Sequence, residues 1–153
     1  MDNYKLIILT FVVTGLWDVV LRFMSLHFEK LPFIIKYSMP FINDLKPYFE
    51  RHTLLAAALI AGFVGATTQA IILLIMSFPR NLKNIPYILT FFTLSFVISA
   101  LFGLPMKWTK LFPHLETYYY DKLGLIKGMY HDGISGLIVQ GTILFLFVCK
   151  SLL

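Results

Sequence analysis

Residues 54–78, LLAAALIAGFVGATTQAIILLIMSF, decide the class of fold, because the stretch is predominantly apolar and carries no charged side chain. A helix needs about 20 consecutive apolar residues to cross the hydrocarbon layer of a membrane. Three more stretches of this kind occur in the chain, at residues 4–26, 85–106 and 134–152. We therefore predict an all-α integral membrane protein, in which residues 1–153 form a single membrane domain built as a four-helix bundle.

The composition agrees with a membrane protein and limits the kinds of binding partner that are expected. Hydrophobic residues make up 58% of the chain, charged residues 14%, and the mean hydropathy is +0.78. The net charge of +5 comes from basic residues scattered between apolar stretches, which favours anionic lipid headgroups over nucleic acid as the partner. The single cysteine, Cys149, excludes an intramolecular disulfide, and no metal or cofactor motif is present.

Two long connections, residues 27–53 and 107–133, join the predicted helices on one side of the membrane, and both termini lie on the other side. The connections mix apolar residues with lysines, and prolines divide the first of them into short pieces. We predict amphipathic interfacial helices, with apolar side chains toward lipid and lysines outward. Most of the 13 lysines and arginines belong to this side, so the positive-inside rule predicts cytoplasmic loops and lumenal or exterior termini.

A weak internal repeat is compatible with this layout. Shifting the chain by 80 residues places the first predicted helix on the third and the second on the fourth. We predict two tandem helix–loop–helix units of the same orientation, related by an axis along the membrane normal.

Small residues recur at helical spacing in the second predicted helix. They allow two backbones to approach closely, which is how helices associate inside a lipid bilayer. We predict packing within the chain through this face, and the competing use is contact with a second copy in a homo-oligomer. The residues are Ala58, Gly62, Gly65, Ala66 and Ala70.

Polar residues inside the predicted spans form a candidate site. Asp18 and Arg22 lie one turn apart in the first span, so we predict that they pair on one helix face. At ~1.5 Å of rise per residue, Ser99, Ser135 and Gln140 fall in the same outer third of the membrane, with Gln69 much deeper. The favoured interpretation is structural pairing between helices; the alternative is a site for a proton, an ion or a solute.

Signals for catalysis are poor. The pair His131 and Asp132 could act as general acid or base near lipid headgroups, but no histidine has the spacing of a metal motif. A simpler interpretation makes Asp132 the cap of the fourth helix. A non-enzymatic role is therefore favoured over a lipid-modifying enzyme.

Two stretches, GLWDVVLRFMS at 15–25 and LKPYFERHTLLAAALIAGFVGATTQ at 45–69, resemble small multispanning membrane proteins of large double-stranded DNA viruses of protists and algae. The resemblance covers about a quarter of the chain. It implies residence in a virion membrane or a host-derived membrane and a structural role, and it transfers no functional residue.

The leading hypothesis is a structural or scaffold protein whose basic, aromatic loops contact anionic lipid or a protein partner on the long-loop side. The residues that would make this contact are Lys46, Arg51, Lys110, Lys122 and Lys127. The first alternative is a small transporter or proton pathway using Asp18, Arg22, Gln69 and Gln140. The second alternative is a lipid-modifying enzyme using His131.

Overall fold

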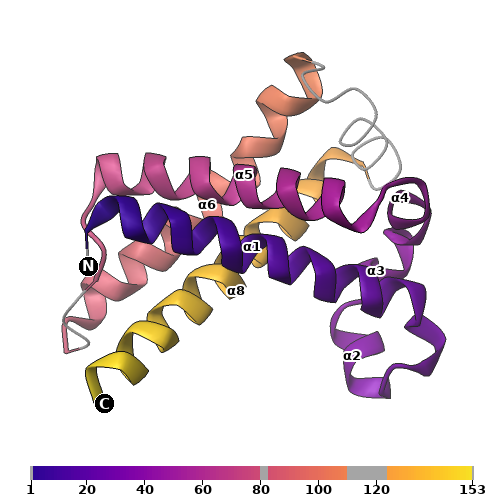
Figure 1. The fold of residues 1–153 in the computed structure, drawn as a ribbon, viewed down its shortest axis with the longest axis horizontal. Coiled ribbons are helices and arrows are strands. Elements are labelled where there is room, and N and C mark those ends of the chain that lie inside the picture. Colours follow the sequence, from indigo (N-terminus) through magenta and orange to yellow (C-terminus); the bar gives the residue numbers. More distant parts are fainter. Residues whose placement is uncertain (1, 80–82, 110–123, 153) are drawn as a thin grey trace.

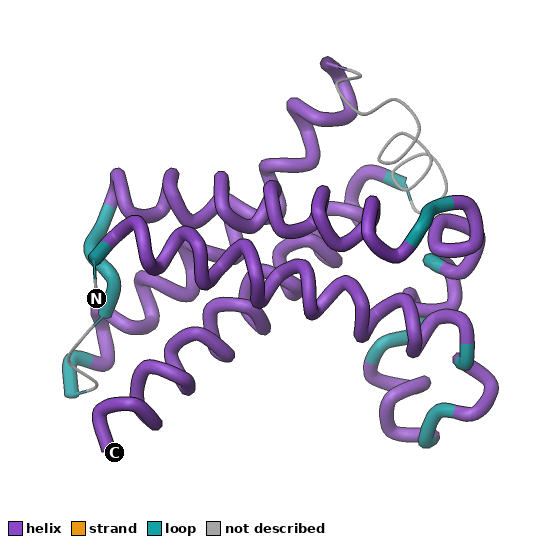
Figure 2. The backbone as a smooth tube through the Cα atoms, in the orientation of Figure 1, coloured by secondary structure: helices purple, strands orange, loops and turns teal. Residues whose placement is uncertain are grey.

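A computed structural model describes residues 2–79, 83–109 and 124–152, and all regular structure in these ranges is helical (Figures 1 and 2). Four long helices form a bundle, and each is long and apolar enough to cross a membrane. The predicted all-α four-helix bundle is confirmed, and the chain fits a multi-pass integral membrane protein. The four helices are α1 (Asn3–Leu26), α5 (Leu54–Ile75), α6 (Ile85–Thr109) and α8 (Leu125–Leu152).

The fourth long helix begins earlier than predicted. Helix α8 starts at Leu125, directly after Gly124, whose φ of 79° lies in the left-handed region that favours glycine. The predicted start at residue 134 is therefore wrong, and Asp132 lies inside α8 instead of capping it. Close packing against α6 keeps this stretch helical despite its glycines and charges. Of the predicted connection 107–133, residues 110–123 lie outside the described ranges.

The connection between α1 and α5 consists of four short helical pieces. They are η1 (Phe28–Lys30), α2 (Phe33–Ser38), α3 (Phe41–Asp44) and α4 (Lys46–Arg51). Prolines stand at or just inside the starts of α2, α3 and α4, where a missing N–H is tolerated.

The apolar residues of this connection face two different surroundings. Ile42, Leu45 and Phe49 are buried against Leu21 of α1, so the prediction that they face lipid is wrong. They close the end of α1 because this end of the bundle has no other cover within the described ranges. The apolar side chains of α2 stay exposed, as expected for an interfacial helix.

The bundle is made of two helix pairs. Helix α1 packs along α5, and α6 packs along α8, in the two most extensive contacts of the structure. Smaller contacts join α5 to α6 and α8 to α1, so the four helices form a closed ring. Both termini lie at one end of this ring and the α2–α4 connection lies at the other (Figure 1).

Glycines of α5 make the first pair close. A Cβ atom added to Gly62 would lie 2.8 Å from the carbonyl oxygen of Phe11, and one added to Gly65 would lie 2.1 Å from Thr14 Oγ1. A hydrogen atom is therefore all that these two positions accommodate. Ala58, on the same helix, carries the carbonyl that approaches Gly15 of α1. Ala66 and Ala70 are half-buried.

The second pair repeats this arrangement. Gly133 and Gly136 of α8 face Phe96 and Ser99 of α6, as Gly62 and Gly65 of α5 face Phe11 and Thr14 of α1. In both pairs a phenylalanine and a hydroxyl residue, three positions apart, meet two glycines that are also three positions apart. The two pairs are therefore built on one plan.

The sequence carries the same correspondence once the correct register is known. FVVTGLWDVVLRF at 11–23 aligns with FVISALFGLPMKW at 96–108, and GFVGATTQAIIL at 62–73 aligns with GISGLIVQGTIL at 133–144. The first helices correspond by a shift of 85 residues and the second helices by a shift of 71.

Burial follows these registers along the helices. At five of the matched pairs of positions, the residues of both units are buried: Leu6 and Phe91, Thr10 and Ser95, Gly15 and Ala100, Gln69 and Gln140, Ile72 and Ile143.

The two-unit organisation agrees with the prediction, but the predicted register of 80 is wrong. The distance along the chain from Phe11 to its partner Gly62 is longer than that from Phe96 to Gly133, because the first unit contains α2–α4. No single shift can therefore align both helices. Since equivalent contacts join α5 to α6 and α8 to α1, the units are related by an approximate two-fold axis along the bundle.

Candidate functional site

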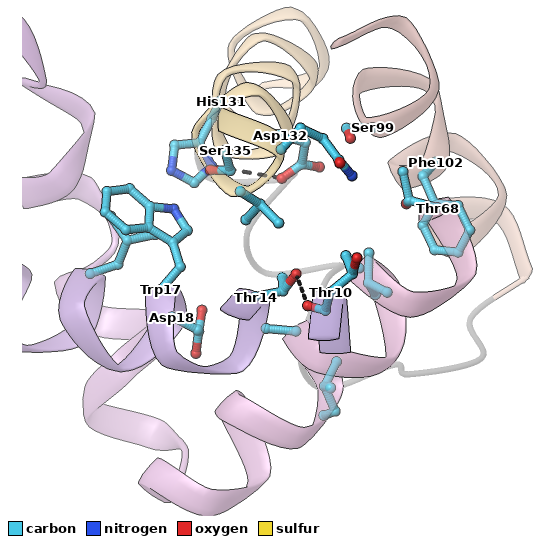
Figure 3. Close-up of a pocket in the computed structure, with 18 of the residues that line it drawn as sticks. Thr10, Thr14, Trp17, Asp18, Thr68, Ser99, Phe102, His131, Asp132 and Ser135 are labelled. Carbon is cyan, nitrogen blue, oxygen red and sulfur yellow. Dashed lines mark hydrogen bonds and ion pairs between the residues drawn. The ribbon is translucent and has the colours of Figure 1, made fainter. Parts of the chain in front are cut away.

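A cavity of about 150 Å³ lies between the four long helices (Figure 3). We call it the polar cavity, because half of the residues that line it carry polar side chains. Leu45 and Phe49 of the α2–α4 connection also line it. The polar lining consists of Thr10, Thr14, Trp17, Asp18, Thr68, Ser99, His131, Asp132, Ser135 and Gln140.

The glycine contacts of the two helix pairs set the positions of the hydroxyl groups in this lining. Thr14 and Ser99 occupy equivalent places, each against a glycine of the partner helix. Thr14 Oγ1 donates to the carbonyl oxygen of Thr10 at 2.7 Å, one turn earlier in α1. The hydroxyl hydrogen is thereby directed to the helix backbone, and the oxygen lone pairs stay available as acceptors.

Two glutamines meet across the approximate two-fold axis. Gln140 Nε2 donates to Gln69 Oε1 at 2.5 Å, and Thr10 Oγ1 lies 3.3 Å from the same oxygen. Both amides are fully buried, at 2% and 0% exposure for Gln140 and Gln69. Equivalent residues of the two units are therefore in direct contact.

The glutamine pair is not fully satisfied. Gln69 Nε2 and Gln140 Oε1 have no hydrogen-bond partner among the described residues. A buried polar atom without a partner costs about 1–3 kcal/mol. Gln140 lines the polar cavity, and its unpartnered carbonyl oxygen is enclosed beside the glutamine pair.

The glutamines mark the inner end of the cavity. Along α8, Gln140 lies ~12 Å from Asp132, and along α1, Thr10 lies the same distance from Asp18, at ~1.5 Å per residue. Beyond this level, toward the termini, the bundle is filled by an apolar cluster. That cluster contains Leu6, Ile72, Phe78, Phe91, Val139 and Ile143.

The charged residues lie at the outer end of the cavity. Asp18 comes from α1, and Asp132 comes from α8 beside His131. His131 Nδ1 is 3.7 Å from Asp132 Oδ1. Figure 3 shows Trp17 and Asp18 on one side of the cavity and His131, Asp132 and Ser135 on another.

The structure brings four of the five predicted cluster residues to one cavity. Asp18, Ser99, Ser135 and Gln140 all line it, and Arg22 does not. In the described part of the chain, Arg22 forms no ion pair with Asp18; its Nη1 donates to the carbonyl oxygen of His52 at 2.5 Å. The long arginine side chain reaches the end of the bundle, where the chain leaves α4 and this carbonyl accepts.

The predicted depth of the two glutamines is also corrected. Gln69 was expected to lie much deeper than Gln140, yet the two side chains are hydrogen-bonded to each other. The cause is the start of α8 at Leu125, which places Gln140 further inside the bundle than a start at residue 134 would.

Several cavity residues were not predicted from the sequence as members of this site. Thr10, Thr14 and Thr68 had a usable signal, because hydroxyls at helical spacing within apolar spans mark a polar face. His131 and Asp132 were singled out only as a cap or an acid–base pair. Trp17 carried no signal that distinguishes a cavity wall from a lipid-facing aromatic residue.

The predicted lipid-contact residues lie away from the cavity or outside the described ranges. Lys46 and Lys127 are exposed, and Arg51 is the last residue of α4. Lys110 and Lys122 lie outside the described ranges.

Metal chemistry receives no support from the described residues, which hold no group of three His, Cys, Asp or Glu side chains that could bind a metal ion. The side chains of the polar cavity can bind a solute through hydrogen bonds and charge. Comparison with protein families, curated proteins and solved structures gives no match to this chain.

Proposed function

We propose that the protein is a small membrane carrier that binds a polar solute in the polar cavity. The observation that carries this proposal is a cavity in the middle of the bundle with hydroxyl, amide and carboxylate groups from all four long helices. Polar and ionisable groups inside a membrane are costly, and they commonly mark a pathway or binding site.

A purely structural bundle would be filled differently. On the termini side, the described helices are packed with aliphatic and aromatic side chains. The same helices contribute polar groups and a void of about 150 Å³ on the other side. This asymmetry supports a binding chamber closed at one end by the apolar cluster and the glutamine pair.

Filling the cavity should abolish transport. Ser135→Phe places a ring in the cavity, and uptake by proteoliposomes should fall at least about tenfold, the effect of 1.4 kcal/mol. The measurement is uptake of radiolabelled ethylammonium, acetate and glycerol, with protein-free liposomes as background.

The matched control is Thr93→Phe, which adds a ring at an exposed position of α6 outside the cavity lining. Uptake should be unchanged in this variant. Equal uptake by both phenylalanine variants and the parent protein would contradict the proposal, as would the absence of uptake above background for all three solutes.

A second role, contact with the lipid headgroup layer, is supported by helix α2, which has three exposed apolar residues. Phe33, Ile34 and Tyr37 are 78%, 75% and 80% exposed, and Lys36 lies on the same short helix. Such a helix is suited to the headgroup layer, with its apolar side chains in lipid. In this role Lys46 and Lys127 would contact anionic headgroups of the leaflet that covers the long connections, on the cytoplasmic side by the charge rule.

Charge reversal should reduce the retention of anionic lipid. Each basic residue near an anionic surface contributes about 1 kcal/mol, so Lys46→Glu should lower phosphatidylglycerol retention about fivefold. Native mass spectrometry of the protein released from mixed bilayers measures this retention. Lys5→Glu, at the opposite end of the bundle, is the control, and equal retention by the two variants would rule out a lipid platform at Lys46.

A further inference from the structure

The geometry points to a small primary ammonium ion as the solute, bound in the polar cavity with Asp18 and Asp132 as counter-charges and oxygen atoms of the polar lining as acceptors. This inference rests on the proposed function and names the chemical class of its solute. It combines four independent features of the cavity: charge, hydrogen-bonding capacity, aromatic walls and the places where the two units differ.

The charge of the described lining is negative. Its carboxylates are Asp18 and Asp132, and no lysine or arginine is among the described residues that line the cavity. Arg22, one turn along α1, does not line the cavity; its positive charge acts on Asp18, and its Nη1 donates to the His52 carbonyl at the end of the bundle. His131 lies beside Asp132 and is the other titratable side chain of the lining. Two carboxylates inside a membrane-spanning bundle favour the binding of a cationic solute.

The described polar lining offers several hydrogen-bond acceptors beside an unpartnered donor, the indole N–H of Trp17. Gln140 is buried and its Oε1 atom has no partner among the described residues. The oxygen of Thr14 also accepts, because its hydrogen is donated to the Thr10 carbonyl. A primary ammonium group carries three N–H donors and no acceptor, which complements carboxylate, amide and hydroxyl oxygens.

Aromatic side chains complete the wall. Trp17, Phe49 and Phe102 line the cavity together with the two carboxylates. The faces of aromatic rings attract cations, most strongly when water is excluded. Trp17 and Phe102 are equivalent in the two units, and Phe49 comes from the α2–α4 connection of the first unit.

The charges occur where the two units depart from their common plan. Asp18 corresponds to Gly103, and His131 and Asp132 correspond to Ile60 and Ala61. The glycines, hydroxyl residues and glutamines that build the frame are shared by both units. The charged groups are therefore additions to a common frame, and all three line the cavity.

The volume limits the size of the ion. A cavity of about 150 Å³ matches one that holds a benzene-sized molecule. Ethylammonium is smaller than this limit and serves as the probe. Tetramethylammonium has the same charge as ethylammonium but no N–H donor. Acetate is a small anionic probe, and propanol is a small neutral probe.

The test is binding to the full-length protein in nanodiscs, measured by isothermal titration calorimetry and by thermal unfolding. Ethylammonium should bind and raise the unfolding temperature, and tetramethylammonium, acetate and propanol should bind at least about tenfold more weakly. Asp18→Asn and Asp132→Asn should each weaken ethylammonium binding about tenfold or more. Asp44→Asn, at an exposed position of α3, is the matched control and should bind like the parent.

Two different failures can be distinguished. If acetate or propanol binds, or tetramethylammonium binds as well as ethylammonium, and Ser135→Phe abolishes that binding, the primary ammonium assignment is overturned while the carrier function stands. If Asp18→Asn and Asp132→Asn bind ethylammonium as well as Asp44→Asn does, the primary ammonium assignment is overturned as well. If no probe binds and no uptake occurs in proteoliposomes, the proposed function itself fails.

Discussion

Gly62→Ala is expected to lower the free energy of unfolding by about 1–3 kcal/mol, the usual cost of inserting a methyl group into a packed interface. The new Cβ would lie 2.8 Å from the Phe11 carbonyl oxygen and 3.1 Å from two atoms of its ring. A backbone oxygen cannot move alone, so α1 must shift away from α5. Unfolding of the bicelle-embedded protein by a denaturing detergent measures the difference.

The chain supplies a matched control for this substitution. Gly141 lies in α8 with nothing within 4 Å of a Cβ added there. Because alanine favours helix more than glycine, Gly141→Ala should be neutral or stabilising by up to about 1 kcal/mol. The same chemical change is thus expected to have opposite signs at two helical glycines, and equal effects would show that the α1–α5 contact is looser than described.

Replacing one member of the glutamine pair should destabilise the bundle by about 1–2 kcal/mol. In Gln69→Leu, the amide of Gln140 loses its acceptor, and the Thr10 hydroxyl loses its contact with that oxygen. In Gln140→Leu, Gln69 loses its amide donor. The double variant leaves no unpaired amide, so it should cost less than the sum of the two single variants.

A double-mutant cycle on the unfolding free energy measures this coupling. The expected coupling energy is about 0.6–1.7 kcal/mol, the range of side-chain hydrogen bonds between membrane helices. Asn43→Leu, at an exposed position of α3, controls for the loss of an amide away from the bundle interior. Strict additivity of the glutamine variants would mean that the bond between them contributes nothing to stability.

Hydropathy was enough to predict the four-helix bundle, because a helix that crosses a bilayer must be apolar over most of its length. It failed at the start of α8, where Lys127, His131 and Asp132 lower the local hydropathy. Those residues are helical because α6 packs against them and because His131 and Asp132 face a cavity inside the protein. Hydropathy is a property of single residues, so it cannot reveal that α6 packs against this part of α8.

The sequence predicted the depth of three site residues, but it did not predict where the side chain of Arg22 points. Counting the rise per residue placed Asp18, Ser99 and Ser135 in one layer, and all three line the cavity. The one-turn spacing of Asp18 and Arg22 predicted a pair, and the Arg22 charge does act on Asp18, but the spacing could not show that the guanidinium donates to the His52 carbonyl. The repeat was visible in hydropathy, but its register was hidden by conservative replacements and by unequal connections.

The contact between Gln69 and Gln140 joins equivalent residues, and a hydrogen bond between two identical amides can run in either direction. In the described direction Gln140 donates and the Thr10 hydroxyl lies near the accepting oxygen of Gln69. In the reverse direction Gln69 would donate, and Ser95, the counterpart of Thr10, would stand beside Gln140. In either direction one carbonyl oxygen and one amide NH₂ group of the pair are left over, and in the described direction these are Gln140 Oε1 and Gln69 Nε2.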